Sequence, residues 1–74
     1  MRSKPFDRIR FGQNLRQARV AVGLTQAELA RKACLSENTI SRLERGQSGM
    51  SVLTFVALVN ALETRPAHLL SGIE

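Results

Sequence analysis

Residues 24–46 read LTQAELARKACLSENTISRLERG and contain two helix starts in close succession. Thr25 and Glu28 have the spacing of a capping box, in which the two residues serve each other's unpaired backbone N–H groups. Ser36 is a second N-cap residue and precedes another stretch with helical spacing. The segment therefore predicts two short helices joined by a tight turn at Cys34–Leu35.

The second of these helices has an apolar side and a polar side when its residues are placed about 100° apart. Thr39, Ile40, Leu43 and Glu44 fall on the side that faces a core, and Glu37, Asn38, Ser41, Arg42 and Arg45 fall on the other side. Such a polar side is often only a solvated surface. Here it holds arginine, asparagine, glutamate and serine, which are side chains that hydrogen-bond base edges. The helix also follows a capped helix after a tight turn, the arrangement that places a second helix in the major groove of DNA.

Further helix signals surround this pair, and no long alternation of apolar and polar residues indicates a strand. The preceding helix has Phe11, Leu15, Ala18 and Val22 at helical spacing and Gly23 as its stop. Ser51 caps a helix over 52–62, and Pro66 and Gly72 bound a short last helix. The helix over 52–62 is apolar on most sides, which predicts that it is central and buried. The sequence thus predicts an all-α domain of five helices.

The composition favours an anionic partner and gives no sign of catalysis. The chain of 74 residues has a formal net charge of +5, which suits nucleic acid or a membrane surface. No strongly basic amphipathic helix stands out, and no apolar run is long enough to span a membrane. A single cysteine excludes an intrachain disulfide and a cysteine-built metal site. We therefore expect a one-domain cytoplasmic protein that is not an enzyme and has no cofactor, no metal site and no membrane contact.

The stretch QAELARKACLSENTISRLER, residues 26–45, resembles the helix-turn-helix of the phage-repressor and Cro type, often called the Xre family. The matching features are Gln26 at the start of the first helix, Leu29 and Ala30 packing inward, Ala33 in the turn, Ile40 and Leu43 in the second helix, and the sequence LERG after them. The similarity runs from about Phe11 to Gly72. It implies a five-helix, lambda-repressor-like fold in which the helix after Ser36 reads double-stranded DNA.

The resemblance implies two groups of DNA contacts. The base-reading positions are Glu37, Asn38, Ser41 and Arg42. Contacts to the DNA backbone are expected from Thr25, Gln26, Arg45, Gln47 and Ser48, the first two beside the N-terminal amides of a helix, which suit phosphate. Two of these residues have a plain structural alternative. Glu37 in a first helical turn favours the helix dipole, and Gln26 is otherwise an ordinary exposed residue.

An ion pair and a basic arm complete the expected site. In the family, an arginine at the position of Arg19 pairs with the glutamate of LERG, here Glu44, and locks the first helix to the recognition helix. The core-side position of Glu44 agrees with this role, because an inward carboxylate without a cation is costly. Residues 1–8 are expected to form a basic N-terminal arm that reaches DNA, or else only a solubilising frayed end. Residues 9–74 are expected to form the helix-turn-helix domain.

Cys34 departs from the family, which usually has glycine at this position of the turn. Glycine tolerates the positive φ angle that the turn often uses, whereas cysteine is strained there. Either the turn avoids this conformation or it loses stability. We expect Cys34 to act as a small buried apolar residue, with a redox-sensing thiol as the alternative.

The expected function is that of a sequence-specific transcriptional regulator that binds a two-fold, double-stranded DNA operator as a homodimer. One recognition helix reads only a few base pairs, and two-fold dimers place two such helices in successive major grooves. The expected dimer interface is C-terminal and includes His68, Leu69 and Ile73, with Leu69 or Leu70 also expected to fill the core. The alternative is an antitoxin-type module that binds a toxin protein as well as its own operator.

Overall fold

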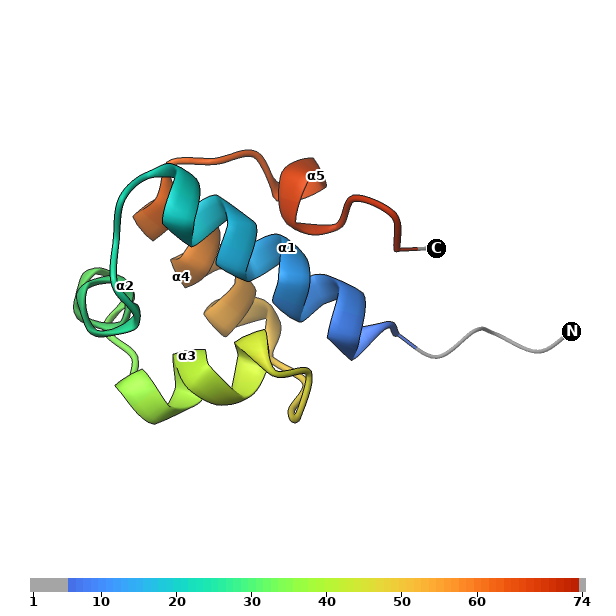
Figure 1. Ribbon diagram of the computed structural model, residues 1–74, viewed down its shortest axis with the longest axis horizontal. Coiled ribbons are helices and arrows are strands. Elements are labelled where there is room, and N and C mark those ends of the chain that lie inside the picture. The colour runs from blue at the N-terminus through green and yellow to red at the C-terminus, as the bar shows by residue number, and fades with distance from the viewer. Residues whose placement is uncertain (1–5, 74) are drawn as a thin grey trace, which may run out of the picture.

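The computed structural model describes residues 6–73, and their regular structure is entirely helical (Figure 1). The helices are α1 (Arg8–Ala21), α2 (Gln26–Ala33), α3 (Glu37–Glu44), α4 (Val52–Leu62) and α5 (Pro66–Leu69). The predicted all-α fold of five helices is confirmed, with α2 and α3 as the helix-turn-helix. In Figure 1, α3 runs along the lower edge of the molecule and α5 lies at the opposite edge.

The predicted helix starts are confirmed by their hydrogen bonds. The Thr25 hydroxyl accepts from the Glu28 N–H at 3.1 Å, and the Glu28 carboxylate accepts from the Thr25 N–H at 2.9 Å. Hydrogen bonding from the Thr25 backbone N–H, and after it from the Thr25 side chain, lowers the pKa of Glu28 because it favours the ionised carboxylate. Ser36 and Ser51 cap α3 and α4 in the same manner. Asp7 caps α1, which the sequence interpretation missed.

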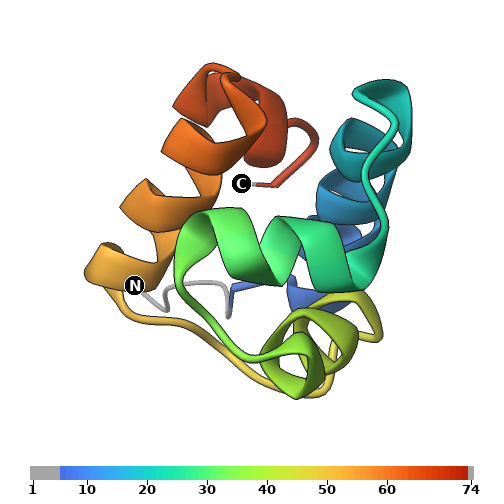
Figure 2. The same cartoon turned by 90° about the vertical axis from the view of Figure 1, so that its left-hand side faces the viewer.

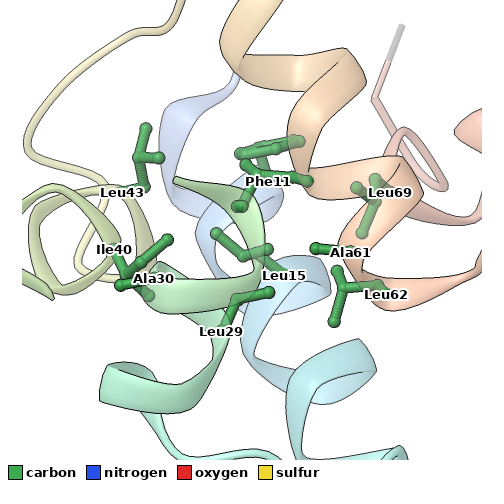
Figure 3. Close-up of a cluster of buried hydrophobic side chains, with 11 residues drawn as sticks. Phe11, Leu15, Leu29, Ala30, Ile40, Leu43, Ala61, Leu62 and Leu69 are labelled. Atoms are coloured by element: carbon green, nitrogen blue, oxygen red, sulfur yellow. The ribbon is translucent and has the colours of Figure 1, made fainter. Parts of the chain in front are cut away.

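All five helices contribute to one apolar core (Figure 3). Its members are Phe11, Leu15, Leu29, Ala30, Ala33, Ile40, Leu43, Leu58, Ala61, Leu62 and Leu69. Helix α1 packs against α3 and α5, while α2 packs against α3 and α4. The labelled side chains in Figure 3 converge from these helices on a common centre. The recognition helix α3 is therefore held from behind by two other helices.

The expectation that α4 is central and buried is wrong. Its buried residues are Leu58, Ala61 and Leu62. Val52 and Leu53, in its first turn, are 77% and 82% exposed. The reason is that α2 and α5 pack on α4 from one side, and Figure 2 shows α4 at the outer side of the bundle, across from α1. Apolar composition predicts how much surface a helix needs to bury, but not which of its sides the neighbouring helices cover.

The apolar run of α1 ends at Val22, which is the C-cap residue and is 51% exposed. One expectation about the C-terminal part needs correction. Leu69 is fully buried, so it belongs to the core and has no surface left for a dimer interface. Ile73 is half-buried against the core. His68 is exposed, with Nδ1 3.1 Å from the Thr64 hydroxyl.

Gly12 allows α1 and α3 to touch through their backbones. A Cβ atom at this position would lie 2.5 Å from the carbonyl oxygen of Leu43 and 2.6 Å from that of Glu44. These separations are far below van der Waals contact, so only glycine permits the observed approach. The contact fixes the C-terminal end of α3 against α1. The sequence interpretation did not single out Gly12.

Candidate nucleic-acid interface

The structure brings the predicted base-reading residues together on one side of α3. Ile40 and Leu43, which are 0% and 2% exposed, anchor the opposite side to the core. The base-reading candidates are Glu37, Asn38 and Arg42, which are exposed, and Ser41, which is half-buried. Guanidinium, carboxamide and carboxylate groups match the edges of guanine, adenine and cytosine in the major groove. This exposed side of α3 is therefore suited to reading base pairs.

The N-terminus of α2 presents backbone N–H groups at the surface. The capping box uses the N–H groups of Thr25 and Glu28. Within residues 6–73, the N–H groups of Gln26 and Ala27 donate to no other protein group, as is usual for a first helical turn. They also lie at the positive end of the helix dipole, which favours an anion. Thr25 is exposed and Gln26 is half-buried, so a DNA backbone could reach both residues.

A polar cluster behind these two surfaces joins α1, α2 and α3. Arg19 Nε donates to Glu44 Oε2 at 2.6 Å, and Arg19 Nη2 donates to Glu44 Oε1 at 3.0 Å. Arg19 Nη1 donates to the Leu24 carbonyl at 2.9 Å. The Gln26 amide donates through Nε2 to Glu44 Oε1 at 3.1 Å, a bond that the sequence interpretation missed. The side chains of Arg19 and Glu44 are 12% and 4% exposed.

The two charges of this cluster stabilise each other. The hydrogen bond that Arg19 donates to Glu44 raises the pKa of Arg19 above its ordinary value, although burial acts in the opposite direction. The pairing is bidentate, which is the strongest geometry for an arginine and a carboxylate. No buried side-chain nitrogen or oxygen in the described part of the chain lacks a hydrogen-bond partner. The cluster is thus a fully satisfied link between α1 and the C-terminal end of α3.

Cys34 adopts the left-handed conformation that glycine usually provides in this turn. Its φ angle is 57°, and the Leu35 N–H reaches back to the Ala30 carbonyl at 2.8 Å to close the end of α2. The expectation of a buried cysteine is wrong, because the left-handed backbone directs this side chain into solvent. A non-glycine residue in this conformation costs about 1–2 kcal/mol. The turn therefore carries backbone strain immediately before the recognition helix.

The remaining backbone-contact candidates lie at the end of α3 and in the loop after it. Arg45 and Gln47 are exposed and Ser48 is half-buried. Arg45 Nε donates to the Ser41 carbonyl at 3.2 Å. Arg8, which the sequence interpretation placed in the arm, is the first residue of α1. Arg2 and Lys4 of the proposed arm lie outside the described residues.

Two other kinds of site find no support in the residues that the structure describes. In the range 6–73, no helix is both long enough and apolar enough to cross a membrane. Over the same range, His, Cys, Asp and Glu side chains do not gather in groups of three that suit a metal ion.

Together, a capped pair of short helices and an exposed polar face on the second define a helix-turn-helix DNA-binding protein. A model of the helix-turn-helix family HTH_3 matches residues 15–69, and the chain belongs to this family of DNA-binding transcription regulators. The restriction-modification controller protein C.AhdI from Aeromonas hydrophila is 38% identical, with 85% of this chain and 96% of that chain covered and a TM-score of 0.83. The clp gene regulator ClgR from C. glutamicum is 33% identical, with coverages of 90% and 87% and a TM-score of 0.81. No curated protein matches the sequence significantly.

Proposed function

We propose that the protein is a cytoplasmic, sequence-specific regulator that binds a two-fold DNA operator as a homodimer. The observation that carries the proposal is the exposed polar side of α3, held from behind by Ile40 and Leu43. Within that side, Asn38 and Arg42 are the main base-reading residues, Glu37 is a further one, and Ser41 allows close approach. Of the similar proteins, C.AhdI is named a restriction-modification controller protein and ClgR a clp gene regulator, which supports a regulatory function. The antitoxin alternative gains no support from the fold or from these relatives.

The DNA backbone is bound on both sides of the recognition helix in this proposal. The N-terminus of α2 takes one phosphate through the free backbone N–H groups of Gln26 and Ala27, together with the Thr25 hydroxyl and the Gln26 side chain. At the other end of α3, contacts to the DNA backbone come from Arg45, Gln47 and Ser48. Arg2 and Lys4, which precede the Asp7 cap of α1 in the sequence, add charge that attracts DNA without reading its sequence.

Arg42→Ala is expected to weaken binding to the operator by about 1–3 kcal/mol and to relax the preference at one base pair of each half-site. The physical reason is the exposed guanidinium, which pairs with the O6 and N7 atoms of guanine. The operator is first recovered by selection from random duplexes. Titrating the protein with this operator and with an unrelated duplex gives the two affinities. An equal loss on both duplexes would assign Arg42 to phosphate instead.

The dimer interface is proposed on an apolar surface at the start of α4, which differs from the surface expected from the sequence. Its members, here named the α4 patch, are Val52, Leu53, Val56 and Leu70. A hollow of about 200 Å³ adjoins the α4 patch. It is lined by Phe6, Met50, Ser51, Val52, Phe55 and Leu70. Exposed apolar side chains gathered in this way are typical of protein interfaces. His68 and Ile73 stay candidates for the edge of the interface, whereas Leu69 is excluded by its burial.

Leu53→Asp is expected to convert a dimer into a monomer at micromolar concentration and to weaken operator binding. The fold should survive, because Leu53 is 82% exposed and an acid in the first turn of α4 favours the helix dipole. Sedimentation of the parent and the variant measures the change. Val20→Asp is the matched control, since Val20 is 59% exposed on α1, away from the patch. A parent that is monomeric at every accessible concentration, with Leu53→Asp binding the operator equally well, would refute this interface.

A further inference from the structure

We propose that Glu44 is a positioning residue for DNA binding, which acts through Gln26 to fix the phosphate-binding end of α2 relative to α3. The inference rests on the proposed function, because it takes the Gln26 side chain to face the DNA backbone. Glu44 does not itself contact DNA, since its side chain is only 4% exposed. Its effect on binding therefore passes through the groups that it holds.

The chemistry of the carboxylate determines how the Gln26 amide is turned. Glu44 Oε1 accepts from Gln26 Nε2 at 3.1 Å and from Arg19 Nη2 at 3.0 Å. An ionised carboxylate is only an acceptor, so the amide must direct its NH₂ group, and not its oxygen, toward Glu44. One N–H of Gln26 is thereby used, and the second stays available for a phosphate oxygen. Without Glu44 the amide would be free to turn its oxygen to the phosphate, where two acceptors would meet.

A second bond holds the backbone at the same place. Arg19 Nη1 donates to the carbonyl of Leu24, two residues before Gln26, at 2.9 Å. Glu44 orients this guanidinium through two further hydrogen bonds. The start of α2 is thus held through its side chain and through its backbone by a cluster centred on the last residue of α3. An interface fixed in this way before binding loses less conformational entropy on binding.

A lone carboxylate near DNA would repel phosphate, but Glu44 is paired with a cation. Arg19 lies against both Glu44 oxygens, so the pair carries no net charge. The remaining effect of Glu44 on a phosphate at α2 is directional: it sets where the donors point. A purely structural role for the ion pair would stabilise the fold but leave the affinity of folded protein for DNA unchanged.

The test uses the full chain and compares Glu44→Gln, Gln26→Ala and the double variant. Glu44→Gln keeps the side-chain shape, but its NH₂ group replaces one of the two acceptor oxygens and would face an N–H donor of Arg19 or Gln26, so the network cannot stay intact. Each single variant is expected to bind about tenfold more weakly, both to the selected operator and to an unrelated duplex, because phosphate contacts carry no sequence information. The double variant is expected to bind no more weakly than Gln26→Ala. Gln17→Ala, which removes an exposed glutamine from α1, is the matched control and should bind like the parent.

Binding is measured at temperatures where circular dichroism shows each variant to be folded. Glu44→Gln with parental affinity, or losses that multiply to about a hundredfold in the double variant, would overturn the positioning role. One measurement needs only the parent protein. A side-chain N–H of Gln26 should exchange with water more slowly than the side-chain N–H groups of Gln17. Equal exchange rates would also overturn the positioning role. A parent that binds no duplex refutes the proposed function itself, which is a different result.

Discussion

Replacing Glu44 with alanine is expected to lower the free energy of unfolding by about 3–5 kcal/mol. The reason is that the Arg19 guanidinium, 12% exposed, would lose both carboxylate oxygens and become a part-buried cation without a counterion. Thermal or urea unfolding of the variant and the parent measures the difference. This loss is the cost of leaving one partner unpaired. It exceeds the net contribution of the intact pair to stability, because forming a buried pair also costs desolvation.

A double-mutant cycle with Arg19→Ala tests the cause of this loss. If the two side chains act as a pair, the double variant should be distinctly less damaged than the sum of the two single variants, because no uncompensated charge is left. Losses that simply add would show that each residue stabilises the fold independently of the other. Glu63→Ala, at an exposed carboxylate after α4, is the control and should change stability little.

Gly12→Ala is expected to lower the free energy of unfolding by about 3 kcal/mol, the upper end of the usual range for overpacking. The added methyl group would overlap the carbonyl oxygens of Leu43 and Glu44, at 2.5 and 2.6 Å, and backbone atoms cannot swing aside as a flexible side chain does. The sign is informative, because the same change in an exposed helix interior stabilises by about 1 kcal/mol. Urea unfolding of the parent and the variant supplies the measurement.

Gly49→Ala is the matched control for this prediction. A Cβ atom at residue 49 would make only ordinary contacts, at 3.8 Å from the Arg8 side chain. Its stability should therefore stay close to that of the parent. An unfolding free energy for Gly12→Ala that equals or exceeds the parental value would mean that α1 and α3 do not approach as closely as described.

The helix starts and the polar side of α3 were predictable because they depend on neighbours in sequence. Thr25 and Ser36 bond to groups three residues away, so the residues themselves specify the caps. The periodicity of α3 places Ile40 and Leu43 on one side, whatever the rest of the fold does. These local rules were enough to identify the helix-turn-helix.

The failed predictions concern which surfaces other helices cover. The apolar composition of α4 did not reveal that Val52 and Leu53 face solvent, because that depends on where α2 and α5 pack. For the same reason, the sequence did not decide between the core and an interface for Leu69. Asn14 was also missed: its amide donates to the carbonyls of Leu69 and Ser71, a pairing that only the fold creates.

Two features of the site needed three-dimensional information of a finer kind. The sequence indicated that Cys34 would be strained in a left-handed turn, but not that the turn adopts this conformation and exposes the thiol. The resemblance implied the pair of Arg19 with Glu44, which the structure brings together. It did not imply the hydrogen bond from Gln26 to Glu44, because these residues lie 18 positions apart in the sequence and no local pattern links them.

The central claim is that the exposed side of α3 reads the major groove, and methylation protection on the selected operator tests it most directly. Dimethyl sulfate modifies guanine N7 in the major groove and adenine N3 in the minor groove. We predict that the protein protects guanine N7 in two patches centred about 34 Å apart along the duplex. Arg42→Ala should lose protection of one guanine in each patch. Protection confined to adenine N3, or unchanged by Arg42→Ala at every guanine, would contradict the account.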